Sequence, residues 1–244
     1  MYSKPVTNAE SRGNPEPISK PRRGPRRSLE LPQVVDAALL VVDEGGPEAL
    51  SVRAVAGRLG VNPNALYTYV ASRAALEREI VERVLAESDL TLLADGDRSW
   101  RQRVVAYGTS LRQSLLRHPA VARLMMTAPM DGPTALLVGE RLIGALVEGG
   151  LSADDAARST YALIVQVLGS VALEVAETDG RPPLPPEQDR IAGRRAMFEW
   201  VDAAQWPMTA ATKDVAAQWI SSDQFVWSVD RLLDGIAELR AQGH

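Results

Sequence analysis

Residues 50–70 read LSVRAVAGRLGVNPNALYTYV, and this stretch predicts two short helices that cross closely. Ala56 is small where the helices would approach, and Gly60 can take the positive φ that a tight turn between them requires. The apolar positions that would fill the small core between the helices are Val55, Leu59, Val61 and Leu66. The pattern is typical of a helix-turn-helix.

The second helix of the pair carries residues suited to reading DNA. Asn62 is a good N-cap, and Pro63 fits the first helical turn, where its missing N–H costs nothing. In a helix-turn-helix the N-terminal end of this helix enters the major groove. We therefore expect Pro63, Asn64, Thr68 and Tyr69 to face base edges, with Asn64 able to pair with adenine and Thr68 able to contact a thymine methyl group.

Other polar residues of the same segment are suited to the DNA backbone. Arg53, on the first helix of the pair, can reach a guanine or a phosphate. Ser51, Tyr67 and Arg73 can bond phosphates and fix the register of the protein on the duplex. A pair of crossed helices also occurs in enzymes that never touch DNA, so this interpretation needs a second signal.

That second signal is a basic segment directly upstream. Residues 1–28 carry seven Lys or Arg and two Glu, whereas the rest of the chain carries 20 basic and 29 acidic residues. Five prolines and few apolar residues predict a flexible arm, and Arg22, Arg23, Arg26 and Arg27 could follow a narrow minor groove. The alternative is a merely solubilising tail.

The remainder of the chain reads as helix. A fourth helix begins near Ser72 and links the head to the body, while the proline-rich residues 179–186 read as a loop. The other expected helices cover residues 31–44, 98–117, 119–127, 133–149, 152–177, 187–203 and 222–240. We predict an all-α fold with a flexible basic arm (1–28), a three-helix helix-turn-helix DNA-binding domain (29–75) and a helical effector-binding and dimerisation domain (76–244).

Composition excludes several classes of function. The chain of 244 residues has no cysteine, so disulfides, thiolate zinc sites and thiolate nucleophiles are excluded. No uncharged apolar run of membrane-spanning length and no signal peptide occur, which predicts a cytoplasmic protein without membrane contact. The motifs of phosphate loops, nucleophile elbows and zinc proteases are absent, and only His118 and His244 could do acid–base work, so we expect no enzyme, metal or cofactor.

Leu31 to about Leu85 resembles the DNA-binding head of the tetracycline-repressor (TetR) family. The matching residues are Val35-x-Ala37-Ala38-Leu39, then Leu50-Ser51-Val52-Arg53-x-Val55-Ala56-x-x-Leu59-Gly60-Val61, Ala65-Leu66-Tyr67-x-Tyr69-Val70 and Ser72-Arg73-x-x-Leu76. The body is similar to the family's C-terminal domain through Leu116-x-His118-Pro119 and Phe225-x-Trp227-x-x-x-Arg231-Leu232-Leu233-x-Gly235. The resemblance implies a homodimeric repressor that a small molecule releases from a palindromic operator in double-stranded DNA.

The dimer and the effector site follow from the same resemblance. We expect the helices near 152–177 and 222–240 to pack against their symmetry mates. Tetracycline repressors hold a magnesium chelate through histidine and acidic groups, whereas this body has one internal histidine, His118, which we expect to be a helix-junction residue. The residues that could line an apolar effector pocket are Trp100, Tyr107, Met125, Met126, Tyr161 and Gln166.

Two alternatives stay open at this point. An architectural or activating DNA-binding protein without a ligand would have a filled body core. A protein-interaction module would use the basic arm on an acidic partner, but it leaves the helix-turn-helix unexplained.

Overall fold

The computed structural model describes residue 1 and residues 29–239, and this part of the chain contains helices and no strand. The predicted basic arm, with Arg22, Arg23, Arg26 and Arg27, lies outside the described residues. The head comprises α1 (Leu31–Gly45), η1 (Pro47–Ala49), α2 (Val52–Leu59) and α3 (Pro63–Leu66). The all-α class is confirmed.

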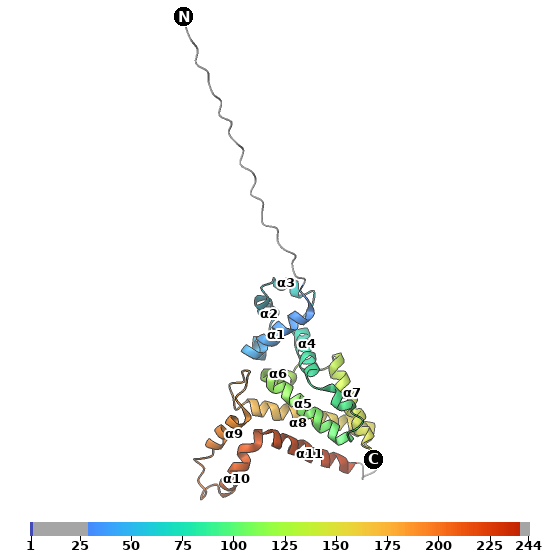
Figure 1. Ribbon diagram of the computed structural model, residues 1–244, viewed down its shortest axis with the longest axis vertical. Helices are drawn as coiled ribbons and strands as arrows, with labels where there is room; N and C mark the ends of the chain where they lie inside the picture. The colour runs from blue at the N-terminus through green and yellow to red at the C-terminus, as the bar shows by residue number, and fades with distance from the viewer. Residues whose placement is uncertain (2–28, 240–244) are drawn as a thin grey trace.

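The body follows α4 (Arg73–Glu87), the helix that connects it to the head (Figure 1). The elements of the body are η2 (Leu90–Ala94), α5 (Trp100–Arg117), α6 (Pro119–Met125), α7 (Pro133–Glu148), α8 (Ala153–Val175), α9 (Glu187–Ala196), α10 (Pro207–Ala217), η3 (Gln218–Ile220) and α11 (Ser222–Glu238).

The head is held by helix caps and a small apolar core. The Ser51 hydroxyl accepts a hydrogen bond from the Ala54 amide at 3.1 Å and caps the start of α2, and Gly60, with φ at +65°, is its C-cap. Side chains of α1, α2 and α3 meet in the core, where Val34, Val55, Ala56 and Leu66 are fully buried. The turn predicted at Gly60 is confirmed.

Helix α4 belongs to both parts of the molecule. It packs against α1 on the head side and against α5, α6 and α7 on the body side, and Leu76, Ile80 and Val84 are fully buried along it. Helix α4 therefore connects the packing of the body directly to that of the head.

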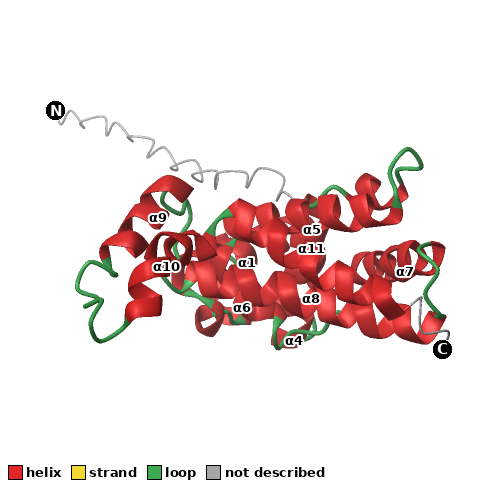
Figure 2. Ribbon diagram, turned by 90° about the horizontal axis from the view of Figure 1, so that it is seen from below, coloured by secondary structure: helices red, strands yellow, loops and turns green. Residues whose placement is uncertain are grey.

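Helix α8 is the central helix of the body. It contacts α5, α6, α7 and α11, while α9 and α10 lie at the end of the molecule opposite α7 (Figure 2). Among the described helices, α8 is the one long and apolar enough to cross a membrane by length and composition, and only 39% of its most apolar window is buried in the protomer. One face of α8 packs in the core and another faces outward.

The predicted helix boundaries were wrong at two places in the body. The helix expected over 187–203 ends at Ala196, and helix α10 was not predicted. No apolar stripe marks the end of α9 or the position of α10, because no residue of α9 is buried and only Ala216 and Ala217 of α10 are. The short η2 also escaped prediction, because a 3₁₀ turn has too few residues to show a period.

Candidate DNA interface and effector cavity

Helix α3 packs against the core of the head and is capped at its N-terminal end. Leu66 is fully buried in the head core, and the Asn62 side-chain oxygen accepts a hydrogen bond from the Asn64 amide at 2.9 Å. Pro63 occupies the first helical position, as predicted. Regular helix ends at Leu66, and the chain continues as a turn through Tyr69, whose amide donates to the Leu66 carbonyl at 2.9 Å.

Four of the predicted DNA-contacting side chains lie exposed on the head. They are Arg53 on α2, Asn64 on α3, and Tyr67 and Thr68 in the turn after α3. The Thr68 hydroxyl donates to the Ala65 carbonyl at 2.8 Å, which leaves its methyl group and an oxygen lone pair for a partner. This end of the molecule lies farthest from the body helices α8 and α11 (Figure 1).

The side chains of three other predicted contacts make hydrogen bonds within the head. The Tyr69 hydroxyl donates to the backbone carbonyl of Leu29, and the Ser51 hydroxyl caps α2. The Arg73 guanidinium pairs with Glu77 at 2.7 Å and donates to the Pro47 carbonyl at 3.0 Å. In this arrangement these groups position the helices; the spacing of Arg73 and Glu77, four residues apart, could have indicated their pairing.

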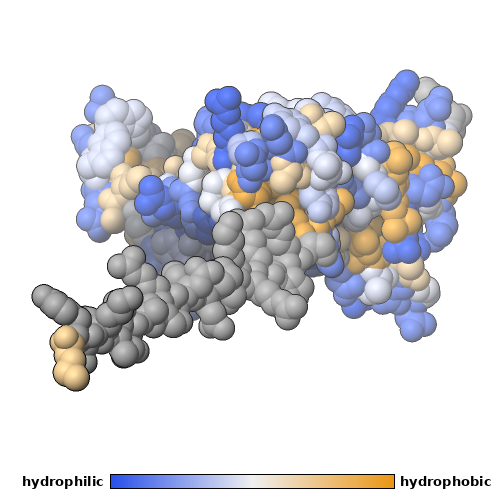
Figure 3. All heavy atoms as spheres, turned by 90° about the horizontal axis from the view of Figure 1, so that it is seen from above, coloured by the Kyte–Doolittle hydropathy of each residue, from blue (hydrophilic) through white to orange (hydrophobic). Residues whose placement is uncertain are grey.

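An apolar cavity of about 350 Å³ lies between α4, α5, α6, α7 and α8. Its walls include Leu85 of α4, Leu111 of α5, Met125 of α6, Ile143 of α7 and Leu168 of α8. A volume of this size suits a small-molecule ligand. In the space-filling view, hydrophobic surface gathers toward the end of the molecule at which α7 lies (Figure 3).

The six side chains predicted to contact a ligand are not gathered in one site. Met125 lines the apolar cavity, Tyr107 lines a small neighbouring cavity, and Gln166 lies in a groove between α8 and α11. Burial raises the pKa of Tyr107 to about 12, so its hydroxyl stays protonated. Tyr161 and Met126 are exposed, and Trp100 packs against Gly149, the C-cap of α7.

Sequence reasoning missed most of the cavity wall. The aromatic and sulfur-bearing residues chosen from the sequence are conspicuous, whereas the wall is built from aliphatic side chains that read as ordinary core. Among the described residues, no group of three His, Asp or Glu side chains is placed to hold a metal ion.

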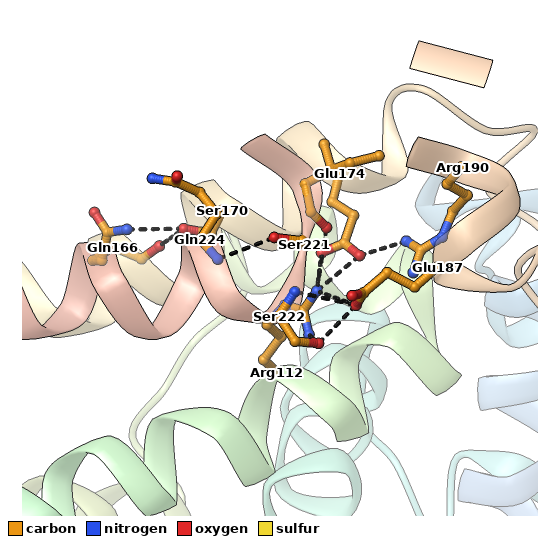
Figure 4. A network of polar contacts seen from close by, with 10 residues as sticks. Arg112, Gln166, Ser170, Glu174, Glu187, Arg190, Ser221, Ser222 and Gln224 are labelled. Carbon is orange, nitrogen blue, oxygen red and sulfur yellow. Dashed lines mark hydrogen bonds and ion pairs between the residues drawn. The ribbon is translucent and has the colours of Figure 1, made fainter. Parts of the chain in front are cut away.

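A cluster of buried charges holds the C-terminal helices to the body (Figure 4). The Arg112 guanidinium of α5 contacts both carboxylate oxygens of Glu174 on α8, at 2.9 and 2.8 Å, and Arg190 of α9 pairs with the same carboxylate. Arg112 also donates to the Ser222 hydroxyl at 3.0 Å, which in turn donates to Glu187 at 2.6 Å. Arg112 and Glu174 are only 3% and 2% exposed.

His118 joins three helices at the boundary between head and body. It ends α5 and begins α6, and its ring contacts Asp43 of α1 and Glu87 of α4. The hydrogen bond to Asp43 raises the pKa of His118, with a further contribution from Glu87 and an opposing one from burial. The sequence predicted a junction residue but gave no sign of its two carboxylate partners.

A helix-turn-helix head on a helical body with an apolar cavity defines a one-component transcriptional regulator. Comparison with known proteins gives its family. The model for "Bacterial regulatory proteins, tetR family" matches residues 34–80, and that for "Tetracyclin repressor-like, C-terminal domain" matches residues 93–240.

Individual relatives agree with these matches. The chain is 28% identical over 227 residues to the HTH-type transcriptional repressor DrrR1 of Streptomyces coeruleorubidus, covering 91% of this chain and 83% of that protein. An HTH-type transcriptional regulator of Saccharopolyspora erythraea is 32% identical over 184 residues, 75% of this chain and 74% of the relative. The fold is similar to that of the Streptomyces coelicolor TetR family protein ActR in complex with actinorhodin, with a TM-score of 0.72, 22% identity and coverage of 88% and 99%.

The chain therefore belongs to the TetR family and is a ligand-responsive, DNA-binding transcriptional regulator.

Proposed function

We propose that the chain is a homodimeric repressor that leaves a palindromic operator when a small molecule enters the apolar cavity. The main support for this proposal is the position of Leu85. This residue forms part of the cavity wall and belongs to α4, the helix that packs against α1 of the head. A ligand that displaces this wall changes the position of the head, and a coupling of about 1 to 3 kcal/mol between the two sites is typical of such regulation.

The proposed dimer uses the outward faces of α8 and α11. Tyr161, Val165 and Leu173 of α8 are 71%, 51% and 72% exposed, and Trp227 of α11 is 59% exposed. A second copy related by a twofold axis would cover these side chains and form a four-helix arrangement. The two heads would then read operator half-sites roughly 34 to 36 Å apart.

The proposed effector is a largely apolar small molecule. The cavity wall is formed by aliphatic and methionine side chains, with Glu140 of α7 as its one charged member. Apolar lining with few polar groups selects ligands mainly by shape. The structure of ActR with actinorhodin supports a small organic ligand in a body of this fold. We further propose that the regulator acts in the cytoplasm and has no catalytic activity.

The experiment that tests the regulator is a titration of the purified protein with a fluorescent DNA fragment from its own upstream region. Salt and excess unrelated DNA are varied, because counterion release makes non-specific binding strongly salt-dependent. Tight binding that resists the unrelated DNA supports a specific operator. Binding that is only salt-sensitive and indifferent to sequence contradicts it.

Asn64→Ala is expected to weaken operator binding by about 1 to 3 kcal/mol, the cost of losing one good base contact. The exposed amide of Asn64 is not needed for the fold, so stability should change little. Gln188→Ala, an exposed amide on α9, is the control and should bind as the parent does. An equal loss on operator and unrelated DNA would contradict direct readout by Asn64.

Ile143→Trp is expected to fill the cavity and to weaken binding of the anionic aromatic dye anilinonaphthalene sulfonate by at least about tenfold, because the larger side chain occupies the volume of the cavity that the dye's rings would enter. The control is Val147→Trp on the same helix, since Val147 is 43% exposed and lies outside the cavity wall. Fluorescence titration measures both. Equal dye affinity in parent and Ile143→Trp would place the ligand site elsewhere.

A further inference from the structure

The His118 ring lies between two carboxylates that belong to other helices. Its Nδ1 is 2.8 Å from Oδ2 of Asp43 on α1, and its Nε2 is 3.2 Å from Oε2 of Glu87, the last residue of α4. The side chain of His118 is 18% exposed and that of Asp43 is 7% exposed. One imidazole thus bridges the head, the connecting helix and the junction of α5 with α6.

Donation to both carboxylates at once requires a proton on both ring nitrogens. A neutral imidazole has one N–H and one lone pair, so it can donate to one carboxylate only and must present a lone pair to the other. The imidazolium donates to both. Asp43 depends on this donor, because its Oδ1 is buried and has no hydrogen-bond partner within the described structure.

The other charges at the junction leave this requirement unchanged. From α4, Arg83 lies 3.6 Å from Glu87 and also pairs with Asp36 of α1; from α5, Arg117 lies 3.5 Å from Glu87. Between η1 and α6, Glu48 and Arg123 pair with each other at 2.7 Å and are exposed. These cations partly offset Glu87, whereas Asp43 has His118 as its side-chain partner.

We propose that the proton on His118 locks the DNA-binding head to the body, and that its loss as the pH rises weakens the contacts of the ring with Asp43 of α1 and Glu87 of α4. The Asp43 hydrogen bond holds the pKa of His118 above its ordinary value. The stabilisation is therefore complete below the unfolded pKa of about 6.5 and is lost as the pH rises through the folded pKa. Head mobility, on which operator binding and release depend, becomes a function of pH.

The test is amide hydrogen exchange of the full chain, with parent and His118→Gln compared at the same pH. Gln has one side-chain donor group on one side only, as neutral imidazole does, so the variant imitates the unlocked state. At about pH 6 the α1 peptide that contains Asp43 should exchange about tenfold faster in the variant, the effect of losing a charge-assisted hydrogen bond. At about pH 9 the two proteins should exchange alike.

Arg123→Gln is the matched control, because it breaks an exposed ion pair at the same junction without removing a group that titrates in this range. Its effect should be the same at both pH values. A His118→Gln effect that is equal at both pH values, or absent at both, overturns the proposal.

A second measurement remains decisive where His118→Gln fails to fold. The chain has only two histidines, His118 and His244, so the ring resonances can be followed by NMR in the unsubstituted protein. The His118 signal should titrate above the ordinary range, and Asp43→Asn should move its midpoint down. A ring that titrates below the ordinary range, or is unaffected by Asp43→Asn, overturns the lock.

Discussion

Replacing Glu174 by Ala is expected to lower the free energy of unfolding by about 3 to 5 kcal/mol, because the cations Arg112 and Arg190 stay buried without their shared carboxylate partner. Arg112 is 3% exposed and Arg190 has a side-chain exposure of 8%, and both direct guanidinium nitrogens at the Glu174 carboxylate. Neither cation can recover its hydration without opening the body. Urea unfolding followed by circular dichroism measures the loss.

The same substitution should release α9. That helix buries no apolar side chain, so its attachment depends on polar contacts, including Arg190 with Glu174 and Arg194 with Glu177. Faster hydrogen exchange in α9 than in α5 would show a local opening in addition to the global loss of stability.

Asp131→Ala is the control for the Glu174 substitution. It breaks the Arg78–Asp131 pair, in which both side chains are well exposed, so the urea midpoint should stay nearly unchanged. A Glu174→Ala protein as stable as the Asp131→Ala protein would show that water reaches the cluster and that its charges are not truly buried.

The fold was predictable wherever local chemistry fixes a helix end or a core position. Ser51, Gly60 and Asn62 act within a few residues of their own place in the sequence, so their roles as caps and turn can be read from the sequence. Helix α10 shows the opposite case, since only Ala216 and Ala217 of it are buried and no apolar stripe marks it in the sequence. The ion pairs that hold α9, Arg190 with Glu174 and Arg194 with Glu177, also join residues that are distant in the sequence and produce no periodic pattern.

The candidate sites differ in the same way, according to whether local sequence or the packing of distant helices places their residues. The exposed residues Arg53, Asn64 and Thr68 could be chosen because a helix-turn-helix has one orientation toward DNA. The cavity could not be predicted from the sequence, because it depends on which aliphatic side chains five helices bring together. The partners of His118 were hidden for the same reason: Asp43 is 75 residues away in the sequence.

Val165→Glu is expected to dissociate the proposed dimer at micromolar concentration and to weaken operator binding by at least about 100-fold. Val165 is 51% exposed on the outward face of α8, close to Gln166 and Gly169 in the groove between α8 and α11. Under twofold symmetry each substitution occurs twice in one interface, so two carboxylates are desolvated together. Losing one head of a linked pair also forfeits the gain in effective concentration, which is worth about 100-fold or more.

Val147→Glu separates this result from a general effect of a surface carboxylate, because Val147 is 43% exposed on α7, outside the α8–α11 groove. Analytical ultracentrifugation and the operator titration should show Val147→Glu to be a dimer with the parent's affinity, while Val165→Glu sediments as a folded monomer. Since monomeric heads still carry Asn64 and Thr68 on an intact α3 region, they should keep sequence preference on a single half-site at high protein concentration. A dimeric Val165→Glu protein with undiminished affinity for the operator would show that the subunit interface does not lie on α8 and α11. It would also contradict the proposed spacing of the two heads.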